Sequence, residues 1–251
     1  MVIRRLPAAA LAGRVTAYHG FAEQGSARVT RREGPGREVV VIISLADGWL
    51  IDGEPRTSFV GGLRRTQVTT EHPGATFGLQ VGLEPPHAHA LLRVSMHELA
   101  GTTIPLDDLL GEPRLADRLH DAPSWDERFA ILDHVLTRRL ADARPSPEIA
   151  WAWARLRHAH GNRSIGELGR ELGWSRKRLV ARFREEVGLA PKAAAQLLRF
   201  ERARELAGSA NWAEVAREAG YYDQSHLVAA FQAFTGRSPG TFLQDEAAAA
   251  A

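Results

Sequence analysis

The chain has 251 residues, of which 44% are hydrophobic and 25% are charged, with a formal net charge of +2. This is the composition of a folded globular protein and excludes the disordered class, and the lack of cysteine excludes disulfides, thiolate metal sites and cysteine nucleophiles. No segment approaches the ~20 apolar residues of a membrane span, so we expect a cytoplasmic protein that does not contact a membrane.

Short apolar runs separated by turn residues predict a β-rich domain over residues 1–108. The runs read VTAYHGF, VVVIISL, TFGLQVGL and LLRVSM, with glycine-rich or proline-rich segments between them. Asp47 and Gly48 form an Asp-Gly pair, which favours the positive φ angles of a tight hairpin turn and predicts pairing of the strands on either side. We expect the strands to form a barrel-like or cupin-like domain.

Beyond residue 108 the apolar residues recur three and four positions apart, which predicts helices. One helical face collects Phe129, Leu132, Val135, Leu136 and Leu140, with Ser124 as the N-cap and Pro145 at the exit. We interpret residues 109–145 as a helical bridge. Residues 146–245, which begin with Ser146 as a cap and Pro147 in the first turn, are predicted to be an all-helical module, and the fold class is α+β.

The helical module contains an internal duplication. GELGRELGW (residues 166–174) matches AEVAREAGY (213–221), and SRKRLVARFREEVGLAP (175–191) matches DQSHLVAAFQAFTGRSP (223–239). Each copy predicts a short helix, a turn at Gly173 or Gly220, a second helix and a Gly-x-small-Pro exit. The module is therefore predicted to be a helix-turn-helix that occurs twice.

The second helix of each copy has an apolar face, which we expect to pack on the helix before it. The apolar residues are Leu179, Val180, Phe183 and Val187 in the first copy and Leu227, Val228, Phe231 and Phe234 in the second. We assign DNA contact to Ser175, Arg176, Lys177, Arg178, Ala181, Arg182 and Arg184 in the first copy and to Gln224, Ser225, His226 and Ala229 in the second. Cationic side chains on a protruding helix suit the major groove, because phosphates attract positive charge and arginine donates to guanine.

These motifs resemble the AraC/XylS family of bacterial transcription regulators. GYYDQSHLVAAFQAFTGRSPGTFL, residues 220–243, is similar to the most recognisable stretch of that family, and the resemblance covers roughly residues 147–243. It implies two helix-turn-helix units joined by a long helix, and double-stranded DNA as the partner. Near the N-terminus, SFVGGL and VSMHELAGTTIPLDDLLG resemble a sensor-type domain that precedes this module in some members, which implies a small-molecule effector of unknown chemistry.

The segment between the two units, residues 191–206, is rich in strong helix formers. About 16 helical residues span ~24 Å, which suits two recognition helices in successive major grooves, where ~34 Å separates equivalent positions. The chain departs from the family pattern at Ala181 and Ala229, where the family often has arginine. Because Arg182 stands beside Ala181, we expect the first unit to supply most of the electrostatic affinity. For the second unit we leave three alternatives open: it contributes to DNA binding through its shape, through hydrogen bonds from Gln224 and Ser225, or only little.

Two further groups of residues have competing interpretations. The aromatic residues Trp151, Trp153, Trp174 and Phe200 are interpreted as core residues rather than base-stacking platforms, and Tyr221 and Tyr222 are expected to pack between helices. His87 and His89 form a His-x-His pair, which on a strand would point both rings to one side, as in a metal cupin. Leu91, Leu92 and Arg93 stand where such a cupin would have glutamate, so no metal site is assigned, and His19, His72 and His97 are expected to be structural.

We therefore predict a DNA-binding transcription regulator with no catalytic residues and no cofactor. The N-terminal domain is expected to change orientation or dimerisation when it binds a small molecule. The candidate partners besides DNA are RNA polymerase and a second copy of the chain. Two alternatives remain open, namely a cupin-like metalloenzyme domain fused to a DNA-targeting module and a DNA binder without sequence preference.

Overall fold

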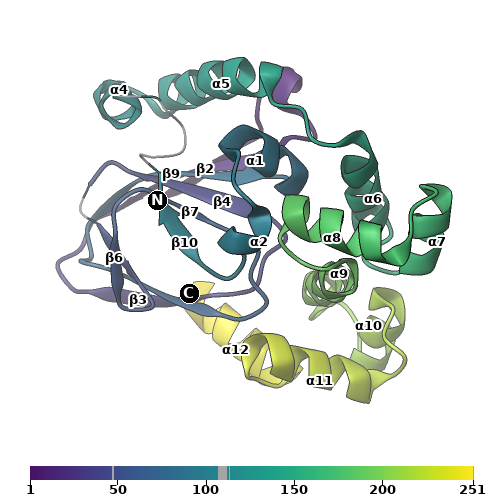
Figure 1. Cartoon of the computed structure of the whole chain (residues 1–251). Coiled ribbons are helices and arrows are strands. Elements are labelled where there is room, and N and C mark those ends of the chain that lie inside the picture. Colours follow the sequence, from purple (N-terminus) through teal and green to yellow (C-terminus); the bar gives the residue numbers. More distant parts are fainter. Residues whose placement is uncertain (47, 107–111, 113, 251) are drawn as a thin grey trace.

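The structure, a computed structural model, describes residues 1–46, 48–106, 112 and 114–250. Its N-terminal half contains two antiparallel sheets and its C-terminal half is helical, which confirms the α+β class (Figure 1). The six-stranded sheet has the order β1-β2-β9-β4-β7-β10, and the four-stranded sheet has the order β3-β8-β5-β6. Over the described residues, the β-rich half is thus a pair of sheets and not a closed barrel.

The strands are β1 (Val2–Arg5), β2 (Val15–Glu23), β3 (Val29–Glu33), β4 (Val39–Ser44), β5 (Trp49–Ile51), β6 (Glu54–Arg56), β7 (Phe59–Gly61), β8 (Val68–His72), β9 (Thr76–Leu83) and β10 (Thr103–Pro105). The helices are the 3-10 turn η1 (Ala9–Leu11), then α1 (Pro85–Leu92), α2 (Met96–Leu99), α4 (Leu115–Asp121), α5 (Trp125–Asp142), α6 (Pro147–His158), α7 (Ile165–Glu171), α8 (Arg176–Val187), α9 (Pro191–Leu206), α10 (Trp212–Ala219), α11 (Gln224–Thr235) and α12 (Pro239–Ala250). None of the described helices is long and apolar enough to cross a membrane.

Strand β4 is covered on both faces, which explains its unbroken apolar run. Val39, Val41 and Ile43 belong to the large core that the six-stranded sheet shares with the helices. Val40 and Ile42 point to the opposite face, because side chains alternate along a strand, and they meet apolar residues of β5 and β8. A second, smaller core therefore lies between the two sheets.

The hairpin predicted between β4 and β5 is wrong. Strand β4 pairs with β7 and β9, whereas β5 pairs with β6 and β8 in the other sheet. The predicted turn residue Asp47 lies outside the described residues. The tight Asp-Gly turn falls instead at Asp52 and Gly53, with φ of 50° and 84°, and it connects β5 to β6. Local turn chemistry favours a hairpin at either Asp-Gly pair, and long-range pairing decides between them.

The strand predicted over LLRVSM is also wrong, because this segment contains the end of α1 and the start of α2. Helix α1 begins with Pro85 and Pro86, whose fixed φ angles suit the first turn of a helix. In the sequence, the same two prolines indicate a turn equally well.

The predicted helix over α5 is confirmed. The backbone amide of Glu127 donates to Ser124 Oγ at 3.2 Å, and the apolar face of α5 is buried. The helix lies on the six-stranded sheet, where the ring of Phe129 stacks on Tyr18 at a centroid distance of 5.8 Å. The Tyr18 hydroxyl donates to Asp133 Oδ1 at 2.9 Å. Packing on the sheet and this hydrogen bond fix the position of α5.

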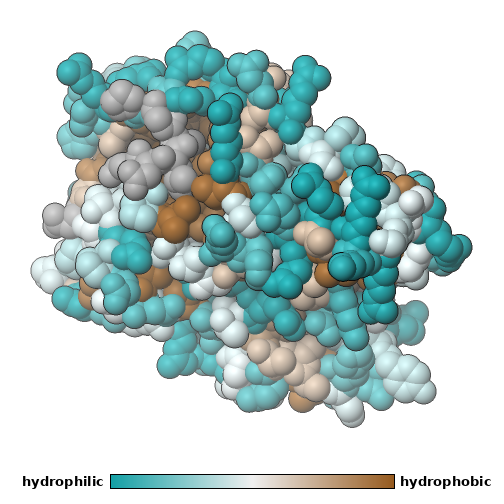
Figure 2. Space-filling model, viewed as in Figure 1, coloured by the Kyte–Doolittle hydropathy of each residue, from teal (hydrophilic) through white to brown (hydrophobic). Residues whose placement is uncertain are grey.

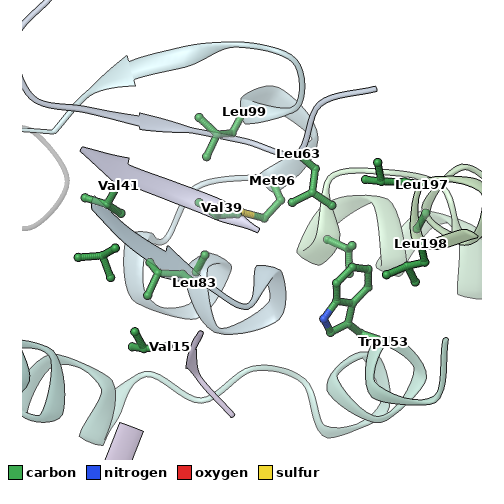
Figure 3. Close-up of a cluster of buried hydrophobic side chains, with 14 of the residues drawn as sticks. Val15, Val39, Val41, Leu63, Leu83, Met96, Leu99, Trp153, Leu197 and Leu198 are labelled. Atoms are coloured by element: carbon green, nitrogen blue, oxygen red, sulfur yellow. The ribbon is translucent and has the colours of Figure 1, made fainter. Parts of the chain in front are cut away.

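The large core runs without interruption from the sheet into the helical half. Figure 3 shows Val39, Leu83 and Met96 in one cluster with Trp153 of α6 and Leu198 of α9. A buried carboxylate reinforces this junction, because Glu84 accepts hydrogen bonds from Trp153 Nε1 at 2.5 Å and from Arg157 Nη1 at 2.6 Å. Burial raises the pKa of Glu84, and the two donors oppose that change. The helical half is thus held firmly on the β-rich half.

Gly161, between α6 and α7, tests the packing of this turn on α9 within the helical half. Its φ is +78°, and a Cβ at this position would collide with the carbonyl oxygen of Ala195 in α9. We expect Gly161→Ala to lower the free energy of unfolding by about 2 kcal/mol or more. The cost of an alanine in the left-handed conformation adds to the cost of its collision with the backbone of Ala195.

Gly173 is the matched control, because its φ is +64° but no atom lies within 4 Å of the position that a methyl group would take. Gly173→Ala should cost only about 1 kcal/mol in urea unfolding. Equal losses for the two variants would contradict the close packing of α6 on α9.

Candidate nucleic-acid interface

The first helix-turn-helix consists of α7, a turn and α8. Ser164 and Ser175 cap the two helices, and the hydroxyl oxygen of Ser175 accepts the amide hydrogen of Arg178 at 3.2 Å. Gly173 has the positive φ that the turn requires. Leu179 and Phe183, on the inner face of α8, are fully buried. Sequence-local caps and apolar spacing therefore produce the predicted motif.

The outward face of α8 lies as predicted. The exposed residues are Ser175, Arg176, Lys177, Arg178, Ala181, Arg182 and Arg184, whereas Leu179, Phe183 and Val187 are buried and Val180 is half-buried. Figure 2 shows hydrophilic side chains projecting from the region where Figure 1 places α7 and α8. Neither Lys177 nor Arg178 is covered by the β-rich half, so both are available to a duplex.

Arg178 is held by an aromatic ring. Its guanidinium carbon lies 4.2 Å from the centroid of Trp174, the residue that precedes the cap of α8. Stacking on an aromatic face restricts the arginine rotamers but leaves its donor atoms free at the edge. The stacking thus limits the directions in which the Arg178 guanidinium can point, at the exposed N-terminal end of α8.

Two other arginines of α8 are engaged within the protein. Arg182 Nη2 donates to Glu186 Oε1 at 2.7 Å, and the side chain of Glu186 is only 1% exposed, which raises its pKa although Arg182 opposes the change. Arg184 Nη2 donates to His97 Nε2 of α2 at 2.5 Å. These contacts draw Arg182 and Arg184 toward the C-terminal end of α8, so Arg176, Lys177 and Arg178 form its available cationic end.

The second helix-turn-helix consists of α10, a turn at Gly220 and α11. Gly220 has a φ of +81°, and Asp223 caps α11 by accepting the amide hydrogen of His226 at 2.8 Å. Leu227 and Phe231 are fully buried. The predicted outward residues Gln224, Ser225, His226 and Ala229 are all exposed. The ring of His226 packs edge-on against Tyr221 at 5.2 Å.

Two predictions for the second unit are wrong. Val228, a predicted core residue, is 37% exposed, since it lies at the margin of the buried face of α11. Tyr222, predicted to pack between helices, is 94% exposed, while its neighbour Tyr221 is buried. Tyr222 is the residue that the first copy lacks, and the extra position turns its side chain to solvent. The core role of Trp153 and Phe200 is confirmed, and Trp151 and Trp174 are half-buried.

Helix α9, which connects the two units, is attached to the β-rich half. Glu201 is buried, and its carboxylate accepts the backbone amide of Arg37 at 2.9 Å and Arg37 Nη1 at 3.1 Å. Burial raises the pKa of Glu201, and Arg37 opposes this. Arg65 donates to Gln196 of α9 at 3.1 Å. Both contacts come from loops of the β-rich half, so the position of α9 depends on these loops.

A cavity of about 610 Å³ lies between the two sheets and reaches α9. Apolar side chains of the smaller core line it, together with Glu201, Arg204 and Glu205 of α9. Three lining atoms are buried without a hydrogen-bond partner among the described residues, namely His19 Nδ1, Trp49 Nε1 and Thr70 Oγ1. Such atoms favour a ligand that supplies the missing partners.

Arg64 adds positive charge to the cavity wall. Its side chain is only 14% exposed, its ion pair with Asp52 is long at 3.9 Å, and burial lowers its pKa. A half-buried cation with a distant counterion favours an anionic group nearby. No sequence pattern indicates this site, because its residues come from strands far apart in the chain.

The His-x-His pair does not lie on a strand. His87 and His89 belong to α1, where residues two apart point in different directions. His89 Nδ1 contacts the carbonyl oxygen of Val94 at 2.8 Å. In the described part of the chain, no group of three or more His, Asp or Glu side chains is arranged to hold a metal ion.

The comparisons with known proteins agree with this geometry. A family model described as a helix-turn-helix domain matches residues 168–245, which contain the second unit and all of the first except the start of α7. The C-terminal module is an AraC-type double helix-turn-helix domain. Its recognition helices are α8 and α11, joined by α9, and a domain of this type implies binding to DNA.

Solved structures share the fold over 90% of the chain. ToxT from Vibrio cholerae with an unsaturated fatty acid bound has a TM-score of 0.52 and 9% identity, over 90% of this chain and 94% of that one. Another structure of ToxT from Vibrio cholerae has a TM-score of 0.51 and 8% identity, over 90% of this chain and 97% of that one. Among curated proteins, none matches the chain in sequence. An AraC-type domain behind a β-rich domain is the architecture of a DNA-binding transcription regulator.

Sequence reasoning missed the buried carboxylates that hold the recognition module, Glu186 and Glu201. A signal existed for Glu186, because it follows Arg182 by four residues and Phe183 by three, which places it beside the apolar face of α8. Glu201 has no comparable signal, since its partner Arg37 is distant in the chain.

The contact between Trp174 and Arg178 predicts a measurable coupling. Trp174→Ala should weaken binding to a selected duplex about threefold to fivefold, because Arg178 loses its stacking partner. In a background of Arg178→Ala, the same substitution should have little further effect.

Lys177→Ala is the matched control, because Lys177 belongs to the same exposed end of α8, whereas the ring of Trp174 is occupied by Arg178. The effects of Trp174→Ala and Lys177→Ala should add. If the effects of Trp174→Ala and Arg178→Ala on affinity were also additive, the positioning role of Trp174 would be contradicted.

Proposed function

We propose that the chain is a sequence-specific transcription regulator that inserts the N-terminal end of α8 into the major groove of double-stranded DNA. The observation that carries this proposal is the exposed cationic end of α8, with Arg178 stacked on Trp174, within an AraC-type domain. The N-terminal residues of a recognition helix are those that reach base edges in helix-turn-helix proteins. Arg178 reads a base, and Arg176 and Lys177 serve the phosphates beside it.

The second recognition helix lies at the other end of α9. This helix has 16 residues and therefore spans about 24 Å. With the thickness of the packed units at each end, this suits two adjacent major grooves on one face of DNA, about one helical turn apart. Selection of bound sequences from a random DNA pool tests this arrangement. Two short motifs with centres about 10 base pairs apart are expected, and enrichment of no motif would favour binding without sequence preference.

Substitutions in the two units compare how much each contributes to DNA affinity. Arg178→Ala combined with Lys177→Ala should abolish binding to the selected duplex at moderate salt and flatten the salt dependence that remains, because fewer counterions are released. Gln224→Ala should weaken binding less and leave the salt dependence unchanged. Titrations at several salt concentrations measure both, and an equal or larger loss for Gln224→Ala would overturn the ranking.

We further propose that the cavity between the sheets holds a small-molecule effector with an apolar body and an anionic group. Support comes from the apolar wall, the half-buried Arg64 and the unpartnered polar atoms of His19 and Thr70. ToxT, which has the same fold, binds an unsaturated fatty acid in one of its structures. A fatty acid is therefore the first class of compound to test.

The cavity wall suggests how such a ligand would act on DNA binding. Glu201 and Arg204 of α9 line the cavity, and Arg37, which holds Glu201, lines it as well. An anionic group near Arg37 competes with Glu201 for the same guanidinium. Occupation would thus alter the attachment of α9 to the β-rich half and with it the placement of α8 and α11.

Arg64→Ala tests the effector proposal. Saturated and unsaturated fatty acids of about 8 to 16 carbons should raise the midpoint temperature of the wild-type protein, because a ligand that binds only the folded state stabilises it. Arg64→Ala should abolish this rise, whereas Arg118→Ala, on the exposed face of α4, should retain it. An unchanged midpoint for the wild-type protein with every acid would contradict this class of ligand.

The remaining parts of the proposal concern catalysis and partners. We propose that the chain has no enzymatic activity and needs no cofactor, because DNA binding and ligand sensing account for its main sites. A homodimer, a contact with RNA polymerase and a cytoplasmic location remain predictions of the same hypothesis.

A further inference from the structure

The two recognition helices differ sharply in charge. Helix α8 contains five Arg or Lys residues, whereas the twelve residues of α11, QSHLVAAFQAFT, include none, and no acidic residue either. The cap of α11 is itself acidic, through Asp223. Figure 2 shows pale and light brown atoms among teal ones over α11, whereas the region around α8 is mostly teal. Helix α11 therefore does not contribute to DNA affinity through the attraction of basic side chains to phosphates.

The exposed face of α11 combines small apolar groups with the polar side chains of Gln224, Ser225, His226 and Gln232. Ala229 and Ala233 are exposed, and Val228 is 37% exposed beside them. Gln224 is exposed in the first turn, where a recognition helix enters the groove. Each of these side chains is free to meet a surface, because the buried face is provided by Leu227, Phe231 and Phe234.

Each of these groups has a partner in the major groove. The C5-methyl group of thymine is the apolar feature of the groove floor, and alanine and other small apolar side chains contact it. Glutamine makes a bidentate pair with adenine. Neither contact requires a cation, and both are specific to A·T pairs.

We propose that α11 reads a half-site of A·T pairs, through contacts of Val228 and Ala229 with thymine methyl groups and of Gln224 with adenine. This inference rests on the proposed DNA-binding function. Helix α8 reads the other half-site through Arg178 and therefore prefers guanine. The operator is chemically asymmetric, with a guanine-containing motif and a thymine-containing motif about one helical turn apart. The exposed hydroxyl of Tyr222, just before α11, offers an uncharged contact to phosphate.

Replacement of thymine by deoxyuridine tests the methyl contacts, because it removes the C5-methyl group and leaves base pairing intact. In the half-site of α11, we expect replacement of each contacted thymine to weaken binding about fourfold. This is the change in affinity that corresponds to the burial of one methyl group. In the half-site of α8, the same replacement should change affinity by less than about twofold. No effect in either half-site would overturn the inference.

Val228→Ala provides the protein side of the test. The substitution removes two exposed methyl groups from a helix and adds a better helix former, so the fold is retained. It should weaken binding to the thymine duplex but leave binding to the deoxyuridine duplex unchanged, and the loss should be the same factor at every salt concentration. A loss that is equal on both duplexes would overturn the inference.

The outcomes separate this inference from the function beneath it. If the wild-type protein enriches no sequence and binds no duplex, the proposed function fails. If it enriches a guanine-containing motif that depends on Arg178, but no second motif and no methyl effect appear, the function stands and the reading of thymine by α11 fails. In that case the neutral face of α11 is a surface for a protein partner.

Discussion

The burial of one face of α8 is the constraint on which the DNA-binding site depends. Leu179, Phe183 and Val187 occupy the interior, so the residues between them must face solvent whatever their charge. The buried Glu186 draws Arg182 along the helix, and His97 receives Arg184. What remains free at the N-terminal end is a short cationic tip, with Arg178 already oriented by Trp174. Packing thus selects which charges can reach DNA.

The same packing joins the β-rich half and the helical module in one body. Among the described residues, a single core extends from the six-stranded sheet through α6 to α9, so the helical module shares its core with the sheet. Two buried carboxylates mark the junction: Glu84 binds donors of α6, and Glu201 of α9 binds Arg37. Because the cavity touches α9 directly, a ligand there needs no long relay to reach the recognition helices.

The helical module could be predicted from the sequence because its signals are local. Caps such as Ser124 and Ser175, glycine turns and apolar spacing lie within a few residues of the helices that they define. The two sheets could not be predicted in the same way. Asp47-Gly48 and Asp52-Gly53 look alike in the sequence, and only pairing with distant strands decides which one forms a hairpin. The exposed faces of α8 and α11 could be predicted from helix periodicity. The hydrogen bonds of Arg182 with Glu186 and of Arg184 with His97 are visible only in the structure.

The contrast between the two recognition helices gives the account its specificity. In the function that we propose, the cationic tip of α8 supplies affinity and reads guanine, and the neutral face of α11 adds discrimination without charge. Such a division would let the second half-site vary in strength without large changes in nonspecific binding, because nonspecific binding depends on phosphates.

Site-specific photo-crosslinking tests the central claim most directly. The chain has no cysteine, so Lys177→Cys creates a unique attachment point for a photoreactive group at the tip of α8, and Arg118→Cys does so on α4 as a control. If α8 enters the major groove, the probe at 177 crosslinks to bases within one motif of the selected duplex, and the probe at 118 does not. Crosslinks from 118 and none from 177 would contradict the account.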